Sequence, residues 1–281
     1  MRPLGRLVRN RTKRLLRAYS FHRPTAAEAR LSALRTLVER ADPALFVSPD
    51  LTPHEFSVFS QNGEDGVVIE ILNRIGAGQT PYFVEFGIES GHQGNCVLLA
   101  DVFGWAGLFL EGDADGFAAL SEKYAGSAVR TRRAQVTADN VNALFAEAGV
   151  PSEPAVVSID IDGNDLYVWQ ALTDFSARLV VIEYNSGIGR PGPVAQPYRT
   201  DRAWDGTGAF GSSLEALEVV GGRLGYRLVH TDLAGVNAFF VREDLAERVG
   251  VARPPRRNQN FGLTGLTHPR SEPEGGWQQV T

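Results

Sequence analysis

Residues 155–165 read AVVSIDIDGND, and this stretch decides the fold of the chain. Its first half is a run of small and β-branched apolar residues, which is typical of a strand buried on both faces of a parallel sheet. Its second half is an acidic turn that leads into a helical pattern. Strand, turn and helix together form the repeating unit of α/β proteins, so the same pattern should recur on either side.

The alternation of strands and helices does recur in both directions along the chain. Strands are predicted at 82–86, 107–110, 128–136, 155–161, 179–183, 226–230 and 237–241, and helices within 55–76 and at 95–103, 116–124, 138–148, 166–172 and 212–222. This order predicts a mostly parallel seven-stranded sheet with helices on both faces. Ligands of such sheets bind at the carboxyl ends of the strands, so the residues that follow each strand are the candidates for function.

The composition is that of a folded protein without membrane spans. The chain has 281 residues, of which 43% are hydrophobic and 22% charged, and its net charge is −5. No apolar run approaches the roughly 18 residues of a membrane-spanning helix, so a transmembrane protein is excluded. The single cysteine, Cys96, excludes an internal disulfide and a multi-cysteine metal site, and it favours a reducing compartment such as the cytoplasm.

The charges are distributed unevenly between the start and the rest of the chain. Residues 1–40 carry a net charge of +9 and the remainder −14. A basic amphipathic helix over residues 1–20 would suit an anionic membrane surface or an acidic partner, or it would pack on its own body or on a second copy in a homo-oligomer. Its narrow apolar stripe favours packing. The acidic remainder argues against nucleic acid as a partner.

These features divide the chain into three parts. The predicted boundaries are a basic helical arm at 1–50, a domain at 51–250 and a tail rich in Pro, Gly and Arg at 251–281. The tail lacks periodicity and is either mobile or an extended strap. Residues 186–213 form a long connection at the active edge of the sheet, which is typical of a lid or binding loop.

Glycines and acids follow the first three strands. Glu85 and Gly87 follow the first strand, but without the GxGxxG spacing of a dinucleotide site, and an acid there suits a cationic ligand better than a pyrophosphate. Glu111, followed by Gly112, can accept ribose hydroxyls or serve as a helix cap. Gln135, after the third strand, is either an adenine contact or a solvated side chain.

The fourth and fifth strands end in the densest group of acids. Asp160 and Asp162 share one side of the strand if its alternation continues, and Glu183 and Asn185 follow the neighbouring strand. Their oxygens would suit a hard cation such as Mg²⁺. The alternative is that they form helix caps and turns, because Asp-Gly-Asn-Asp is also good turn chemistry.

Two histidines and several lid residues complete the candidates. His92 and His230 are each a candidate base or a structural histidine. The lid contains Tyr198, Trp204 and Asp205, an aromatic and acidic combination typical of sugar sites. No GxSxG, Walker A or HExxH pattern occurs, so the corresponding hydrolase and peptidase classes have no support.

Taken together, the motifs resemble class I S-adenosylmethionine-dependent methyltransferases, and most closely their FkbM-like branch. The acid-x-Gly-x-x-x-Gly motif of that branch is matched by Glu85, Gly87 and Gly91. Its Lys-Ile-Asp-Val-Glu-Gly-x-Glu motif is matched by residues 158–165, with Ser in place of Lys and Asp in place of both Glu. Residues 60–66, SQNGEDG, look like the entry to the first helix of these enzymes.

The resemblance implies a fold, a cofactor and a reaction. The sheet would have seven mostly parallel strands with the last one antiparallel, and the chain would transfer a methyl group from S-adenosylmethionine, with help from Mg²⁺, to a hydroxyl of a sugar, polysaccharide or glycosylated metabolite. The implied cofactor contacts are Gln61, Glu85, Gly87, Ser90, Glu111, Gly112, Gln135 and Asp160. The implied metal ligands are Asp160, Asp162, Glu183 and Asn185; the base is Asp162, His92 or His230; and the substrate contacts are Tyr184, Tyr198, Trp204 and Asp205.

Two other classes remain open. A doubly wound sheet also suits an oxidoreductase that uses NAD or a nucleotide sugar, and the body could be a non-catalytic, methyltransferase-like binding module. Methylation of nitrogen is disfavoured because the Asn/Asp-Pro-Pro-Tyr sequence that often serves it is absent after the fourth strand.

Overall fold

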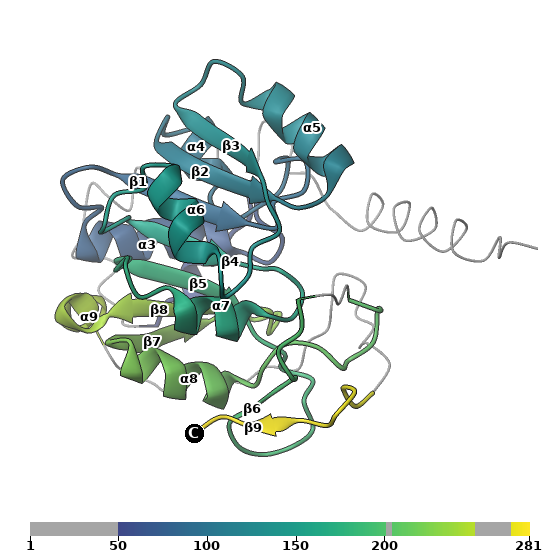
Figure 1. Ribbon diagram of the computed structural model, residues 1–281. Coiled ribbons are helices and arrows are strands. Elements are labelled where there is room, and N and C mark those ends of the chain that lie inside the picture. The colour runs from purple at the N-terminus through teal and green to yellow at the C-terminus, as the bar shows by residue number, and fades with distance from the viewer. Residues whose placement is uncertain (1–49, 201–203, 251–270) are drawn as a thin grey trace, which may run out of the picture.

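The computed structural model of the protein describes residues 50–200, 204–250 and 271–281 (Figure 1). The predicted arm, up to residue 49, and residues 251–270 of the predicted tail lie outside this range. The elements, in chain order, are η2 (Thr52–His54), α3 (Glu64–Ile75), β1 (Tyr82–Phe86), α4 (Val97–Asp101), β2 (Ala106–Glu111), α5 (Ala114–Lys123), β3 (Val129–Arg133), α6 (Val141–Glu147), β4 (Val156–Ile159), α7 (Asp165–Ala171), β5 (Leu179–Glu183), β6 (Val194–Ala195), α8 (Leu214–Arg223), β7 (Tyr226–Thr231), β8 (Asn237–Arg242), α9 (Glu243–Val249) and β9 (Gln278–Gln279).

Seven of these strands form one sheet in the order β3-β2-β1-β4-β5-β8-β7. The strands from β3 to β5 are parallel, and β8 is antiparallel to both β5 and β7. The predicted sheet, mostly parallel with its last strand antiparallel, is therefore confirmed. The chain reverses its direction of winding between β1 and β4, so the crevice for ligands is expected at the carboxyl ends of these two strands.

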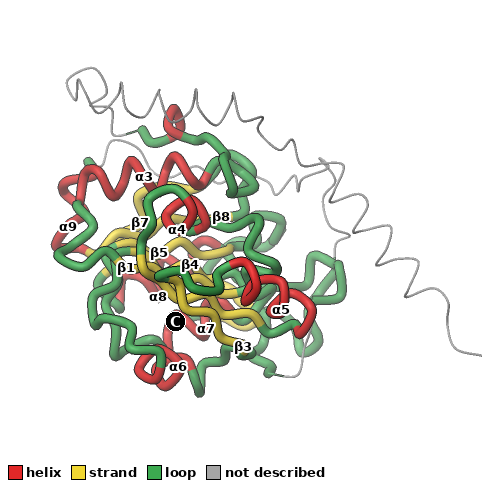
Figure 2. The backbone as a smooth tube through the Cα atoms, turned by 90° about the horizontal axis from the view of Figure 1, so that it is seen from above, coloured by secondary structure: helices red, strands yellow, loops and turns green. Residues whose placement is uncertain are grey.

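Helices cover both faces of the sheet, as Figure 2 shows. Apolar side chains of α6, α7 and α8 pack on one face, and those of α3, α4 and α9 pack on the other. Side chains of β1 alternate between the two layers, because Val84 belongs to the first core cluster and Phe83 to the second. The sheet is buried on both faces, which explains why its central strands read as unbroken apolar runs.

The first helix begins inside the segment at residues 60–66, SQNGEDG, which the sequence pattern places at its entry. It starts at Glu64, after Gly63, whose φ of 102° lies in the left-handed region. The Asp65 carboxylate turns back and accepts the backbone N–H groups of Val58, Phe59 and Ser60 at 2.7, 2.7 and 2.8 Å. These bonds hold the preceding residues in a turn, and the helix cannot extend into it.

The fourth strand ends earlier than predicted. It spans Val156–Ile159, although the apolar run continues to Ile161. The Asp165 carboxylate accepts the N–H groups of Ile161 and Gly163, both at 2.8 Å, so residues 160–164 form a turn closed by a side chain. Because the strand stops at Ile159, its alternation does not extend to the acids that follow.

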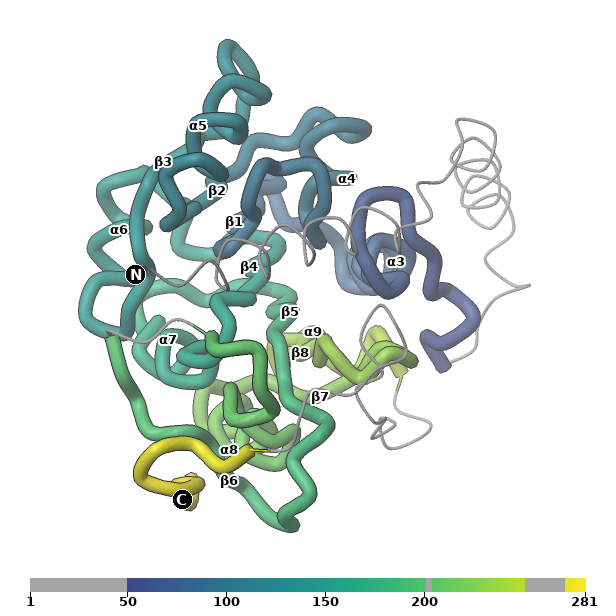
Figure 3. The backbone as a smooth tube through the Cα atoms, turned by 90° about the vertical axis from the view of Figure 1, so that its right-hand side faces the viewer, coloured from purple at the N-terminus to yellow at the C-terminus, as the bar shows by residue number. Residues whose placement is uncertain are grey.

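The lid loop, residues 186–213, contains a short strand that pairs with the end of the chain. Strand β6 is antiparallel to β9, and the N–H of Val280 donates to the carbonyl of Pro193 at 2.8 Å. Figure 3 shows this C-terminal segment beside β6 and α8. Residues 278–279 are thus extended and attached to the lid. Among the described residues, no helix combines the length and the apolar character that crossing a bilayer requires.

Candidate functional site

The candidate site lies where the loop after β1 meets the turn after β4. Gly87 has a φ of 68°, and a Cβ atom built on it would lie 1.9 Å from the carbonyl oxygen of Asp160. Only glycine permits this approach of two backbones. The glycine loop, residues 87–96, and the acidic turn at 160–165 are therefore in direct contact at the switch point of the sheet.

Glu85 anchors the far end of the glycine loop. It is buried, and its two carboxylate oxygens accept the N–H groups of Asn95 at 2.7 Å and Cys96 at 2.9 Å. Asn95 in turn donates to the Ser158 hydroxyl of β4 at 3.0 Å. Burial raises the pKa of Glu85 to about 8, against the lowering effect of the two N–H donors. The structure thus places Glu85 beneath the loop, where it fixes the position of the loop.

Glu111 anchors the near end of the same loop. Its carboxylate accepts the N–H groups of Glu89 at 2.6 Å and Asp113 at 2.7 Å, and its side chain is buried. Glu89 has a φ of 53°, so this hydrogen bond also holds a left-handed residue in place. Each carboxylate oxygen retains a second acceptor site, which leaves Glu111 able to bind a hydroxyl.

The remaining predicted cofactor residues lie on exposed segments around this loop. Gln61, Gly87, Gly112 and Gln135 are exposed, and Ser90 is half-buried. The side-chain amide of Gln135 donates to the carbonyl of Thr200 in the lid loop at 3.4 Å. The end of β3 therefore lies next to the lid.

Three carboxylates form what we term the acid cluster: Asp160, Asp165 and Glu183. One ligand atom from each lies within 4.8 Å of the others, and no other such group of His, Cys, Asp or Glu was found among the described residues. Glu183 Oε2 is buried and has no hydrogen-bond partner among the residues that the structure describes. Burial, followed by the neighbouring acids, raises the pKa of Asp160 and that of Glu183 well above their usual values. The raised pKa values mean that these carboxyl groups resist losing their protons in the absence of a positive charge, and a cation bound among them would favour their ionised forms.

The membership of this cluster differs from the sequence-based prediction. Asp165 belongs to it, whereas Asp162 is exposed, with a φ of 59°, because the strand ends before the turn that carries it. The amide of Asn185 is used within the lid loop: it donates to the carbonyls of residues 208 and 210, both at 3.0 Å, and accepts an N–H from residue 187 at 2.9 Å. Asp165 stands in the sequence as the last residue of the 158–165 motif, but it was not among the predicted metal ligands.

The two candidate histidines lie apart from each other. His92 is exposed on the glycine loop. His230 is buried on β7, three strands beyond β4 in the sheet order, and its Nε2 lies 2.9 Å from Glu55 Oε1. The ring of His230 also packs on Phe239, with centroids 5.5 Å apart. These contacts give His230 a structural role between β7 and the segment that precedes α3.

The predicted substrate residues of the lid loop hold it against the body. The N–H of Ala138 donates to the Tyr198 hydroxyl at 3.2 Å, and the ring of Tyr198 packs on that of Tyr167, with centroids 5.3 Å apart. Asn164, in the acidic turn, donates its side-chain N–H to the carbonyl of Arg199 at 2.6 Å. The lid therefore lies directly beside the acidic turn.

Trp204 and Asp205 make their described contacts within the lid loop. The indole N–H of Trp204 donates to the carbonyl of Thr207 at 2.8 Å, and its ring packs on Phe210, with centroids 5.8 Å apart. Asp205 Oδ1 accepts from the backbone N–H and the hydroxyl of Thr207 at 2.9 and 2.7 Å. Tyr184 is buried beneath the lid. These contacts of Trp204 and Asp205 lie inside the lid, whereas Tyr198 packs on Tyr167 and the backbone N–H of Tyr184 donates to the carbonyl of Val236 at 2.9 Å.

Sequence reasoning missed the acids that support the entry to α3. Asp65 is buried, and burial raises its pKa to about 6 although it accepts three backbone N–H groups. The Asn237 amide of β8 donates to Glu64 Oε1 at 2.9 Å. The sequence does show two consecutive acids at the start of a helix. Acids are common there because they interact favourably with the helix dipole, so the pattern alone does not indicate these contacts.

The sequence matches no protein-family model and no curated protein. Solved structures with a similar chain fold include the N-terminal domain of EvdMO1 with SAH bound, which is 13% identical with a TM-score of 0.40 and matches over 63% of this chain and 79% of that one. TrmK of M. capricolum, in complex with S-adenosylhomocysteine, is 9% identical with a TM-score of 0.36, over 62% and 65% of the two chains. The methyltransferase domain of METTL16 is 10% identical with a TM-score of 0.38, over 63% and 66%. At these levels the likeness extends only to the arrangement of strands and helices, and the strand order of the main sheet gives the described residues a Rossmann-like fold.

Proposed function

We propose that the chain is an S-adenosylmethionine-dependent O-methyltransferase whose acceptor is a hydroxyl of a sugar, a polysaccharide or a glycosylated metabolite, and that it uses a divalent cation such as Mg²⁺. The acid cluster carries this proposal. Glu183 Oε2 is buried without a hydrogen-bond partner among the described residues, beside Asp160 and Asp165 and next to the glycine loop. A buried carboxylate of this kind calls for a cationic partner.

The glycine loop fits the proposed cofactor. S-adenosylmethionine, when bound, supplies a methyl group on a positively charged sulfur. Gly87 lets the loop pack closely on the carbonyl of Asp160, Ser90 lies further along the loop, and Glu111 is held at the end of β2, where an acid can accept ribose hydroxyls. Exposed Gln61, Gly112 and Gln135 surround this path. The acids at this edge match the positive charge of a sulfonium.

The acid cluster fits the proposed cation. Three carboxylates are hard oxygen ligands of the kind that Mg²⁺ prefers, and the unpartnered oxygen of Glu183 supplies one of them. A cation held there would supply Lewis acidity to an acceptor hydroxyl, which is a weak nucleophile when neutral. Asp165 takes the place that the sequence assigned to Asp162 and Asn185 in this set.

Side chains of the protein would accept the proton of the acceptor hydroxyl, and the lid would exclude water. Asp162 is exposed on the turn that carries Asp160 and Asp165, which makes it the proposed acceptor of the hydroxyl proton, with His92 on the glycine loop as the second candidate. His230 has no part in this proposal, because its Nε2 lies 2.9 Å from Glu55 Oε1. Tyr198, bound to residue 138, would hold the lid over the acceptor, and the lid aromatics favour a sugar.

Outside the catalytic core, the proposal keeps the three-part division of the chain. Residues 51–250 form the methyltransferase domain, and the basic arm at 1–50 attaches to the body, to a second copy or to an anionic surface. We place the protein in the cytoplasm on the basis of its single cysteine.

Calorimetry of the full chain tests the cofactor. Titration with S-adenosylhomocysteine should give saturable binding at one site, and titration with NAD should give none. Binding of NAD alone would favour the oxidoreductase, and binding of neither compound would favour a non-catalytic module. Turnover of candidate glycosides is then followed by mass spectrometry as a gain of one methyl group.

Titration with Mg²⁺ tests the acid cluster. The wild-type chain should bind the ion, Glu183→Gln should lose this binding, and Glu147→Gln should retain it because Glu147 lies in an exposed ion pair with Arg132. Full methyltransferase activity in the presence of a chelator would remove the metal from the proposal while leaving the cofactor in place.

A further inference from the structure

The middle of the glycine loop is attached to a group of side chains that the proposed reaction does not use. Lys123 Nζ, at the end of α5, donates to the carbonyl oxygen of Gly91 at 2.5 Å. Gly91 is the last glycine of the sequence motif and has a φ of 72°. The ends of the same loop are anchored by Glu85 and Glu111, so Lys123 supplies a third attachment between them.

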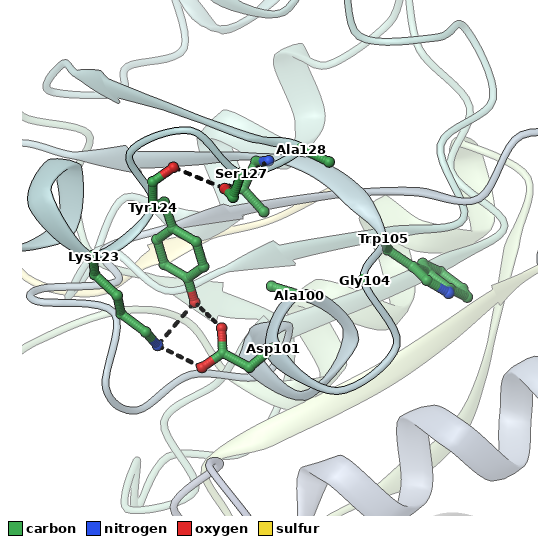
Figure 4. A pocket seen from close by; sticks show the side chains of 9 residues that line it. Ala100, Asp101, Gly104, Trp105, Lys123, Tyr124, Ser127 and Ala128 are labelled. Atoms are coloured by element: carbon green, nitrogen blue, oxygen red, sulfur yellow. Dashed lines mark hydrogen bonds and ion pairs between the residues drawn. The ribbon is translucent and has the colours of Figure 1, made fainter.

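The Lys123 ammonium is itself oriented by two neighbours. It lies 2.7 Å from Asp101 Oδ2 and donates to the Tyr124 hydroxyl at 3.0 Å. The Tyr124 hydroxyl donates to Asp101 Oδ1 at 2.9 Å, which closes a ring of three side chains. An ammonium has three N–H donors, and here all three are used, so its direction towards Gly91 is fixed. Figure 4 shows the three side chains pointing towards one another.

Packing reinforces this attachment. A Cβ atom built on Gly91 would lie 2.6 Å from Leu120 Cδ1 and 3.1 Å from Tyr124 Cε2, so the loop backbone rests directly on α5. The N–H of Gly91 donates to the carbonyl of Ile88 at 3.0 Å, which makes residues 88–91 a tight turn. A shift of Lys123 or Tyr124 would therefore displace this turn as a unit.

The group also borders a cavity of about 420 Å³ at the surface, between the end of α4 and the start of β3. Asp101, Lys123 and Tyr124 line one side of it, and Trp105 lies on the opposite side (Figure 4). The Lys123 side chain lines this cavity and is 22% exposed. Lys123 is one of two lysines in the whole chain, which otherwise uses arginine.

We propose that Lys123 is a positioning residue for the cofactor site, and that Asp101 and Tyr124 hold its ammonium beneath the Gly91 carbonyl so that the glycine loop keeps the shape that binds S-adenosylmethionine. The cofactor part of this inference rests on the proposed function. Lys123 touches neither cofactor nor acceptor in this scheme and acts through the backbone of Gly91. An arginine keeps the charge but not the compact ammonium, so Lys123→Arg should retain only part of the effect.

The test compares Lys123→Met, Lys123→Arg and Asp101→Asn with the control Arg227→Met, which removes two ion pairs, with Glu243 and Glu247, from β7 at the edge of the sheet. Calorimetry should show the Kd for S-adenosylhomocysteine raised about tenfold in Lys123→Met, the size expected when one charge-assisted hydrogen bond is lost. Lys123→Arg and Asp101→Asn should fall between this value and the wild type, and Arg227→Met should match the wild type. KM for the cofactor should rise while kcat changes little.

Hydrogen exchange of the cofactor-free chain provides a second readout that does not depend on the reaction. Amides of residues 88–96 should exchange faster in Lys123→Met, while amides of the turn at 160–165 keep the wild-type rate. Unchanged exchange together with an unchanged Kd overturns the inference, even if Lys123→Met lowers the melting temperature. If the wild-type chain does not bind S-adenosylhomocysteine, the proposed function fails, and the exchange rates alone then decide whether Lys123 positions the loop.

Discussion

Acids at the ends of β1 and β2 behave differently from acids at the ends of β4 and β5. Glu85 and Glu111 each direct both carboxylate oxygens at backbone N–H groups and so fix the glycine loop. Glu183 leaves a buried oxygen without a partner among the described residues, and Asp160 lies beside it. Carboxylates thus support the backbone in the first region and in the turn closed by Asp165, whereas Glu183 keeps a buried oxygen unpartnered among the described residues. Satisfied hydrogen bonds, not residue identity or position in the strand, separate the two roles.

The largest expected effect is a loss of turnover when an acid of the acid cluster, at the ends of β4 and β5, is removed. Asp160→Ala should lower turnover by at least about 100-fold, because it removes one of the three carboxylates proposed to hold the cation. Methyl transfer to the acceptor is measured under cofactor saturation. The exposed acid Asp174, changed to alanine, serves as the control and should leave turnover unaltered. Wild-type turnover in Asp160→Ala would contradict a role for the acid cluster.

The second prediction compares the free energy of unfolding after one acid in each region is replaced. Glu111→Gln should lower the free energy of unfolding by about 1–3 kcal/mol, because an amide places an N–H donor opposite a backbone N–H that the carboxylate accepted. Glu183→Gln should leave stability unchanged or raise it in cation-free buffer, since it removes a buried charge that has no counter-charge.

Urea denaturation in the presence of a chelator measures both variants, with the exposed Glu122→Gln as the reference. Equal losses in Glu111→Gln and Glu183→Gln would mean that the two regions do not differ in the way the hydrogen bonds indicate.

The pH dependence of stability tests the burial of Glu85, at the end of β1. Burial raises the pKa of Glu85 to about 8 in the folded chain, so the folded state keeps a proton that the unfolded state loses near pH 4.5. The contribution of Glu85 to stability is therefore complete below about pH 4.5 and is lost as the pH rises towards 8, at about 1.4 kcal/mol per unit. Asp65 and Glu64 face the same carboxyl and strengthen the effect.

Thermal melts between pH 5 and pH 8 check this slope. In Glu85→Gln the decline in melting temperature with rising pH should be shallower than in the wild type, whatever the absolute stability of the variant. A parallel decline in both proteins would assign the slope to other groups, of which Asp232, whose pKa burial also raises to about 8, is the next candidate.

The smallest effect concerns the lid beside the acidic turn. Deleting residues 274–281 removes β9 and the ion pair between Arg199 and Glu274, at a cost to global stability of less than about 1 kcal/mol because the pair is exposed and the strand is short. Trypsin should then cleave after Arg199 faster than in the full chain. An unchanged cleavage rate would show that β9 does not restrain the lid.

The sequence predicted the fold more fully than the site. Buried strands such as Tyr82–Phe86 and Leu179–Glu183 match their predicted limits, because a continuous apolar run can only lie between two helical layers. The predicted pairing of Asp160 with Asp162 assumed that β4 continued, whereas the Asp165 carboxylate ends it by closing a turn. The partners of Glu85 and Lys123 lie in a loop whose path is set by tertiary contacts, and local periodicity carries no information about such contacts.

The pairing of β6 with β9 has a consequence for how such a protein diversifies. The lid loop, which is proposed to cover the acceptor, is held to the end of the chain, far away in the sequence, by the backbone hydrogen bonds between β6 and β9. Backbone pairing tolerates many side chains, so both segments can exchange residues, and with them the shape offered to an acceptor, without altering any strand of the main sheet. New acceptor preferences would thus arise from substitutions in both the lid loop and β9, while the glycine loop and the acid cluster stay as they are.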